Sequence, residues 1–280
     1  MTPINSLLVA TDFTDRSDRA VERAFQLWNL GGGGRLTLLH VIATGLPPEL
    51  LSRRRSEAET LLADRLARMP ANPDLQAIVV TDDPFSAIIS EAVIRRVDLL
   101  VIGGRGKHRY AGRFLGTTAE CVIRFCDRPV LMVKHASADP YRRVLVAFDG
   151  SEGAIRALHA ALAIAPGAEF RVVHAWWPPH TALGGSEAAK QAIGEENDRI
   201  KALIQEAAKE AVATSPSQPT LDIDMVENNP YVVMRNESAW PDLLVMGTHS
   251  KGRLATTLTV GKLARHLLED VTCDVLVSRP

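Results

Sequence analysis

Short apolar runs alternate along the chain with segments whose apolar residues recur at helical spacing. Continuous apolar runs of this length are typical of strands buried on both faces of a parallel sheet. In the first half we expect strands at residues 7–10, 36–41, 77–80, 98–102 and 130–133. The segments between them predict helices at residues 17–28, 52–69, 84–96 and 116–126.

The second half repeats the same order of elements. Its expected strands are residues 144–147, 170–174, 221–226, 242–246 and 275–277. Its expected helices begin at residue 151, lie within 187–213, begin at residue 230, and lie near 261–269. Strands that alternate with helices predict a parallel sheet covered on both faces. The predicted fold class is therefore α/β, with two tandem doubly wound domains.

Two short motifs return in the second half and indicate a duplication. The sequence LVATD at residues 8–12 returns as LVAFD at 145–149, and DLLV at 98–101 returns at 242–245. Self-similarity over a domain length is typical of repeated structural units. Residues 135–140 are short, polar and contain proline, which favours a linker. We therefore predict domains at residues 1–136 and 141–280.

Composition narrows the classes of partner. Lys and Arg number 32 against 33 Asp and Glu, so the net charge of -1 gives no overall attraction to nucleic acid or to an acidic membrane. Apolar stretches are shorter than the ~20 residues that span a bilayer. The three cysteines, Cys121, Cys126 and Cys273, form no CxxC pair, which favours a reducing compartment. We expect a cytoplasmic protein.

The first half carries glycines at the spacing of a phosphate-binding loop, Gly103-x2-Gly106-x9-Gly116-Thr117, directly after its fourth strand. Glycines let the backbone approach a phosphate closely and adopt a positive φ. The helix that opens at Gly116 offers free N–H groups to an anion. Asp12 follows the first strand and is an acceptor suited to ribose hydroxyls. Because ligands of doubly wound sheets bind beyond the carboxyl ends of strands, this pattern predicts a nucleotide site.

These residues also have purely structural interpretations. Thr117 with Glu120 forms a capping box, so Thr117 can serve only to begin a helix. Asp12, followed by Thr14 and Ser17, can cap the first helix. Each of these features, taken alone, favours a purely structural role. Their combination, in the right order and spacing, favours nucleotide binding in the first domain.

With these motifs the chain resembles a tandem member of the universal stress protein family, whose nucleotide-binding members carry G-x2-G-x9-G-[ST]. The resemblance extends over both halves. It implies a five-stranded sheet in the order 3-2-1-4-5 in each domain. It also implies an adenine nucleotide, ATP with Mg²⁺ or Mn²⁺, at the point where the strand order reverses. The site residues that it implies are Ala10, Thr11, Asp12, Val41, Gly103, Arg105, Gly106, Gly116, Thr117 and Thr118.

The resemblance further implies an assembly. Members of this family commonly pair through the last strand of the sheet. In a tandem chain, the strands at residues 130–133 and 275–277 are then expected to pair within the molecule as a pseudo-dimer, and a homodimer of the chain is a further expectation.

The second half keeps only part of the glycine pattern, with a serine in place of the second glycine and a lysine in place of the threonine. A serine adopts a positive φ at a higher cost than glycine, so another loop path is expected. Lys262 can attract an anion or occupy the phosphate position itself. We therefore expect a structural or regulatory half-site. Its candidate residues are Asp149, Gly247, Ser250, Gly261 and Lys262.

Three functions are compatible with these patterns. The favoured one is a cytoplasmic stress-response or regulatory protein in which ATP is a structural or sensory ligand. The second is a slow Mg-dependent ATPase, although spacing alone identifies no base, nucleophile and orienting partner, so no catalytic residue is assigned. The third is a protein-interaction module that works without nucleotide. No set of side chains is assigned to a protein-bound metal.

Overall fold

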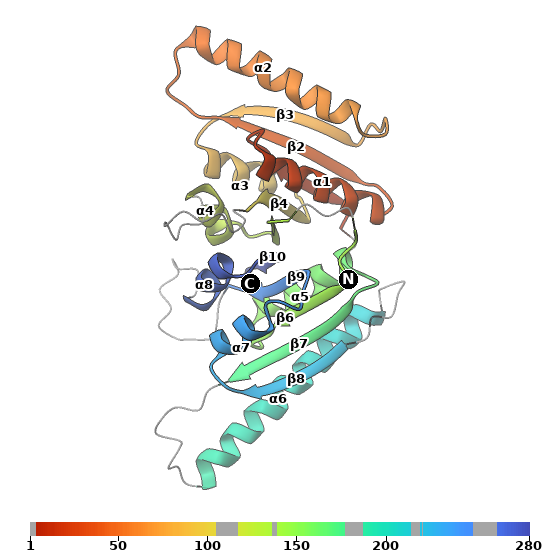
Figure 1. The fold of residues 1–280 in the computed structure, drawn as a ribbon, viewed down its shortest axis with the longest axis vertical. Coiled ribbons are helices and arrows are strands. Elements are labelled where there is room, and N and C mark those ends of the chain that lie inside the picture. Colours follow the sequence, from red (N-terminus) through yellow and green to blue (C-terminus); the bar gives the residue numbers. More distant parts are fainter. Residues whose placement is uncertain are drawn as a thin grey trace. The chain divides into compact units, whose positions relative to one another are not determined.

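The chain divides into two compact units, one ending at Pro140 and the other beginning at Tyr141. The structure is a computed structural model that describes residues 4–104, 117–135, 139–176, 187–213, 219, 221–248 and 262–280. Each unit alternates strands with helices, as the sequence predicts (Figure 1). None of the helices in these ranges has the length and apolar character needed to cross a membrane.

The first unit contains five strands and four helices. They are β1 (Ser6–Ala10), α1 (Asp15–Leu30), β2 (Arg35–Ile42), α2 (Pro48–Ala67), β3 (Leu75–Thr81), α3 (Pro84–Ile94), β4 (Leu99–Gly103), α4 (Thr117–Phe125) and β5 (Val130–Val133). All were expected, with small shifts at the ends. The largest shift is at α2, which begins at Pro48 rather than at residue 52, because proline is accommodated in the first turn of a helix.

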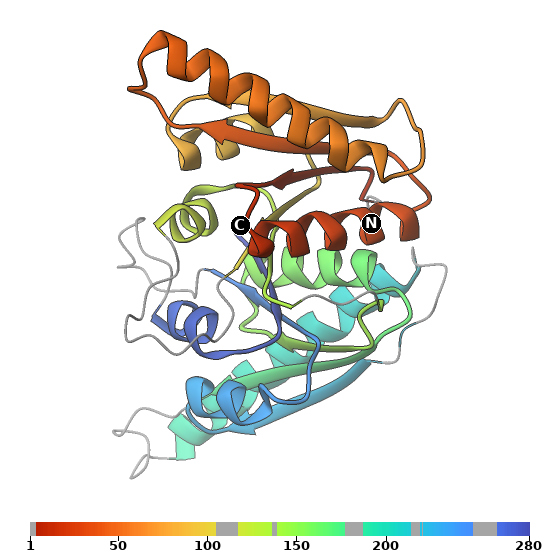
Figure 2. The same ribbon diagram turned by 45° about the horizontal axis from the view of Figure 1, so that its top comes forward.

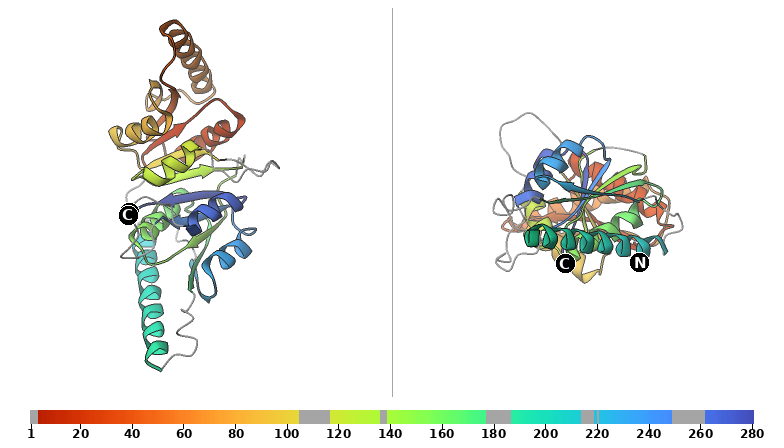
Figure 3. Two further views of the ribbon diagram at one scale, coloured as in Figure 1. Left: turned by 90° about the vertical axis from the view of Figure 1, so that its left-hand side faces the viewer. Right: turned by 90° about the horizontal axis from the view of Figure 1, so that it is seen from below.

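The second unit repeats these elements. They are β6 (Arg143–Ala147), α5 (Glu152–Ile164), β7 (Glu169–Trp176), α6 (Glu187–Ala213), β8 (Leu221–Glu227), α7 (Pro230–Glu237), β9 (Leu243–Gly247), α8 (Lys262–Asp270) and β10 (Asp274–Ser278). Figure 1 shows α6, a helix of 27 residues, alongside β8, and Figure 3 shows the same helix from two further sides. The helix before the fourth strand is shorter here, 8 residues in α7 against 11 in α3.

The strands of each unit are parallel and follow the predicted order. The first unit has the order β3-β2-β1-β4-β5, and the second has β8-β7-β6-β9-β10. The crossover after β1 therefore runs one way along the sheet and the crossover after β4 runs the other way. Because such crossovers are right-handed, they place helices on opposite faces. Figure 2 shows α1 and α2 together on one face of the first unit.

The motif DLLV recurs because its aspartate binds backbone N–H groups at the start of the central strand of each sheet, β1 or β6. In the first unit, Asp98 Oδ2 accepts hydrogen bonds from the backbone N–H groups of Asn5 and Ser6, both at 2.9 Å. In the second unit, Asp242 Oδ2 accepts the equivalent pair from residues 142 and 143, both at 3.1 Å. The leucines that follow lie fully buried in β4 and β9. This repeated motif is structural.

The glycines at positions 31–34 end α1 and turn the chain into β2. The N–H of Gly31 donates to the carbonyl of Leu27, and Gly32, Gly33 and Gly34 all have positive φ. At Gly34, an added Cβ would overlap the carbonyl oxygen of Asn5. These glycines therefore form the turn between α1 and β2.

Candidate functional site

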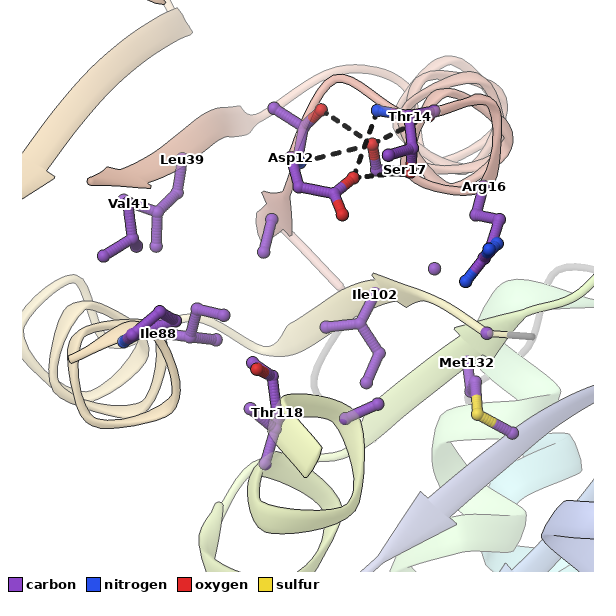
Figure 4. A pocket seen from close by; sticks show the side chains of 17 residues that line it. Asp12, Thr14, Arg16, Ser17, Leu39, Val41, Ile88, Ile102, Thr118 and Met132 are labelled. Atoms are coloured by element: carbon purple, nitrogen blue, oxygen red, sulfur yellow. Dashed lines mark hydrogen bonds between the residues drawn. The ribbon is translucent and has the colours of Figure 1, made fainter. Parts of the chain in front are cut away.

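A cavity of about 540 Å³ opens beyond the carboxyl ends of β1 and β4, where the strand order reverses (Figure 4). This is the position at which doubly wound sheets bind ligands, and the volume is that of a small-molecule site. The fold brings six of the predicted residues to its lining. They are Ala10, Thr11, Asp12, Val41, Gly103 and Thr118.

The other predicted residues of the first site are placed differently. Thr117 is the first residue of α4. Arg105, Gly106 and Gly116 lie outside the described residues, so the structure gives no position for them.

The cavity has an apolar end and a polar end. Figure 4 shows Leu39, Val41 and Ile88 on one side, Arg16 on the other, and Asp12 between them. Leu39 and Val41 alternate along β2 and therefore share a face of the strand. Ile88 comes from α3. The arrangement can receive a flat apolar group at one end and an anion at the other.

Gly103 is required by the close packing of α1, and not by a positive φ. We expected a left-handed backbone at this glycine, but its φ lies outside that region. A Cβ added at Gly103 would lie 2.8 Å from the carbonyl oxygen of Arg16 and 3.0 Å from the backbone nitrogen of Ser17. The missing side chain lets the first turn of α1 rest against the end of β4. This contact closes one wall of the cavity.

A chain of hydroxyl groups fixes the loop between β1 and α1. Ser17 Oγ donates to the carbonyl oxygen of Thr14 at 2.9 Å, so its lone pairs accept from Thr11 Oγ1 at 3.0 Å and from the N–H of Asp12 at 3.3 Å. Thr11 Oγ1 in turn accepts from the N–H of Phe13 at 3.1 Å. Both hydroxyl-bearing residues are buried, each 5% exposed. The hydroxyl of Thr11 therefore shapes the loop from within.

Phe13 sits in this loop with φ of 62°, a conformation that L-residues rarely adopt. Its ring stacks on His40 with centroids 4.3 Å apart, and the guanidinium of Arg65 lies over the ring at 4.8 Å. Arg65 is held in turn by Asp18, with Nε 3.1 Å from Oδ1. The second unit has Gly150 at this position, with φ of 73°. The stack around Phe13 helps to offset a strain that the glycine avoids.

Asp12 does not cap α1, as one interpretation of the sequence suggested, because the N-cap residue of this helix is Thr14; Asp12 instead holds the loop that precedes the helix. Its Oδ1 accepts hydrogen bonds from the N–H of Thr14 at 3.1 Å and from Thr14 Oγ1 at 2.6 Å, which shapes the approach to α1. The residue is nevertheless exposed and lines the cavity. Partial burial raises the pKa of the Asp12 carboxyl, but hydrogen bonds, chiefly from Thr14, outweigh it and lower the pKa below its ordinary value. At neutral pH the cavity therefore contains an ionised acceptor.

His40 connects β2 to the loop between β1 and α1 by a hydrogen bond. Its Nδ1 lies 2.8 Å from the carbonyl oxygen of Thr11, so Nδ1 carries the proton that is donated. In the second unit His174 makes the same contact with the carbonyl oxygen of Phe148, also at 2.8 Å. The equivalent histidines are thus satisfied structural residues.

We predict that acid weakens the first unit through His40. Burial lowers the pKa of His40, with the charge of Arg65 acting in the same direction, whereas the Thr11 carbonyl and Asp12 oppose the shift. Because the folded pKa lies below the unfolded value of about 6.5, stability is present above that value and is lost as the pH falls through the folded pKa. NMR titration of the ring protons checks the first point. Unfolding by urea at pH 7 and pH 5 checks the second.

The variant His40→Gln serves as the control for this prediction. It should identify the His40 resonances by their absence and reduce the loss of stability between pH 7 and pH 5. A His40 ring that titrates at or above the ordinary histidine value contradicts the prediction.

Several residues of the lining were not predicted from the sequence. Thr14, Arg16 and Ser17 come from the start of α1, and Pro84 and Ile88 lie one helical turn apart at the start of α3. Leu39, two residues before Val41 in β2, could have been found from strand alternation. The remaining members are Ile102, Gly104, Ala119, Val122 and Met132.

The second unit repeats part of this geometry. Asp149 Oδ1 accepts from the N–H of Ser151 at 3.0 Å, as Asp12 does from Thr14. At Gly247 an added Cβ would lie 2.6 Å from the backbone nitrogen of Ala154, so α5 packs on β9 as α1 packs on β4. Lys262 is the first residue of α8, whereas Ser250 and Gly261 lie outside the described residues.

Comparison with known proteins agrees with this architecture. The family model described as the Universal stress protein family matches residues 3–134 and 140–279. A universal stress protein of Thermus aquaticus is 30% identical over 136 residues, which cover 46% of this chain and 98% of that protein. One of Mycolicibacterium smegmatis is 23% identical over 98% of this chain and 97% of its own length.

A solved structure shares the fold of the whole chain. The crystal structure of a universal stress protein from Archaeoglobus fulgidus matches with a TM-score of 0.70 and 20% identity, covering 99% of this chain and 98% of that one. At this identity the likeness bears on the fold alone. The two family matches together span nearly the full length. The chain therefore belongs to the Universal stress protein family and carries two copies of its domain.

Proposed function

We propose that the first domain binds ATP together with Mg²⁺ or Mn²⁺, and that the protein is a cytoplasmic stress-response or regulatory protein. The nucleotide acts as a structural or sensory ligand. Because a ligand that binds only the folded state stabilises it by mass action, the ATP concentration sets the population of the bound form.

The cavity at the ends of β1 and β4 carries this proposal. Leu39, Val41 and Ile88 offer an apolar surface to a base, and Asp12 offers an ionised acceptor to ribose hydroxyls. The end of β4 brings glycine backbone close to the opposite side, next to Arg16. An apolar group, a sugar and an anion, in that order, are the parts of a nucleotide.

A divalent cation fits this lining only as a partner of the phosphates. Among the described residues, Asp12 is the one acidic side chain that lines the cavity, and no group of three or more potential metal ligands occurs there. Mg²⁺ characteristically binds through one or two carboxylates plus phosphate oxygens and water. Asp12 is therefore the residue that would orient the cation or the ribose.

Equilibrium dialysis with ATP and magnesium tests the proposal. The wild-type chain should bind one ATP. Asp12→Asn should lower the affinity by about tenfold or more, because a hydrogen bond to a charged group contributes about 1.5–3 kcal/mol. The amide oxygen of Asn can still accept from Thr14, so the loop keeps its shape.

Asp149→Asn is the matched control, since it makes the same change in the second domain. It should leave the affinity unchanged. A wild-type chain that retains no nucleotide, or equal affinities for the two variants and the wild type, would overturn the proposal. Phosphate release measured on the same samples tests whether ATP is also hydrolysed.

A further inference from the structure

Arg16 is a cationic residue of the cavity that the glycine pattern does not include. It lies in the first turn of α1, is exposed, and lines the cavity. Figure 4 shows its side chain extending from α1 toward the cavity, on the side away from Leu39 and Val41. Within the described part of the chain, its guanidinium makes no hydrogen bond or ion pair. The side chain is thus available to a ligand.

The packing of α1 on β4 fixes where this cation lies. The carbonyl oxygen of Arg16 would lie 2.8 Å from a Cβ at Gly103, so the backbone of Arg16 is directly beside the end of β4. Gly103 and Gly104 line the cavity at the same place. An anion held against these glycines lies at the start of α1, where the free N–H groups of the helix add positive potential. No other Lys or Arg among the described residues lines this cavity.

The second domain lacks this cation. In the alignment of the two copies, Asp12 corresponds to Asp149 and Arg16 to Gly153. A Cβ at Gly153 would lie 3.0 Å from the carbonyl oxygen of Ser278, so the second copy leaves little room for a side chain there. The arginine is therefore a property of the first site and not a requirement of the fold.

We propose that Arg16 determines specificity in the first domain by pairing with the terminal phosphates of the nucleotide, so that the site selects triphosphates over monophosphates. This inference rests on the proposed nucleotide site. A guanidinium pairs with two phosphate oxygens at once and is always charged. The contribution of such a pair grows with the number of phosphates within its reach. A monophosphate ends too close to the ribose to gain from it fully.

Calorimetric titration with ATP, ADP and AMP, each with magnesium, tests this role. Arg16→Gln should lower the affinity for ATP about ten- to a hundredfold and the affinity for AMP by less than about threefold. The ratio of the two affinities should therefore collapse. Arg16→Lys should retain part of the preference because it keeps the charge and loses the forked geometry. Arg54→Gln is the control, since Arg54 is exposed on α2, outside the lining, and the change in net charge is the same.

The outcomes separate the two proposals. If the wild-type chain binds ATP but Arg16→Gln weakens ATP and AMP equally, Arg16 has only a structural role and the inference fails. An unchanged ratio overturns it in the same way. If the wild-type chain binds none of the three nucleotides, the proposed function fails and the inference fails with it.

Discussion

Replacement of Gly103 by alanine should destabilise the first domain by about 1–3 kcal/mol and weaken ATP binding at the same time. The added Cβ would lie 2.8 Å from the carbonyl oxygen of Arg16, 2.9 Å from its carbonyl carbon and 3.0 Å from the nitrogen of Ser17. These are backbone atoms, so no rotamer change relieves the overlap and α1 must move away from β4. The first turn of α1 carries Arg16 and Ser17 into the cavity, so its displacement alters the site.

Two further glycines provide controls for this prediction. Gly247→Ala creates the equivalent overlap, 2.6 Å from the backbone nitrogen of Ala154, and should destabilise the second domain without changing ATP affinity. Gly167→Ala adds a Cβ with no atom within 4 Å and should be nearly neutral. Because two domains need not unfold together, hydrogen exchange read by mass spectrometry should assign each loss to its domain. A Gly103→Ala protein that behaves like Gly167→Ala would contradict the close packing.

The order of elements could be predicted from the sequence because parallel strands are buried on both faces. Runs such as 7–10 and 99–102 stay apolar throughout, and the structure places both in the middle of a sheet. The start of α2 could not be predicted, since Pro48 gives no periodic signal and is accepted only because it falls in the first turn. A proline at such a position is compatible both with the loop before a helix and with the first turn of the helix itself.

The site could be predicted where its residues follow strands. Asp12 and Val41 were found because the ends of parallel strands meet at one edge of a sheet. Arg16 and Ile88 were not found, because only the packing of α1 and α3 on the sheet brings these helices to the cavity. Gly103 lines the cavity as expected, but the positive φ expected there was wrong. Sequence patterns distinguish a glycine from other residues, but they do not distinguish a positive φ from a close backbone contact.

The hydroxyl chain of the β1–α1 loop is expected to contribute strongly to the stability of the first domain. Ser17→Ala should lower the free energy of unfolding of the first domain by about 2 kcal/mol, because the change leaves the Thr11 hydroxyl and the Asp12 N–H without their partner in a buried position. The loop also holds Phe13 at a positive φ, so its release should raise amide exchange at Phe13 and Thr14. Hydrogen exchange and urea unfolding measure the two effects.

A double-mutant cycle with Thr11→Val shows whether the two hydroxyls act together. Each single change breaks the hydrogen bond at 3.0 Å between the two hydroxyls. The double variant breaks this bond only once, so a cost that both single changes carry is counted once in it. The loss in the double variant should therefore be smaller than the sum of the single losses by about 1 kcal/mol. The second domain has apolar residues at the positions of these two hydroxyls, Phe148 and Ala154. Gly150 takes the place of Phe13. Strictly additive losses would mean that the hydroxyl chain does not hold the loop, and that the stack of Phe13 between His40 and Arg65 carries its conformation alone.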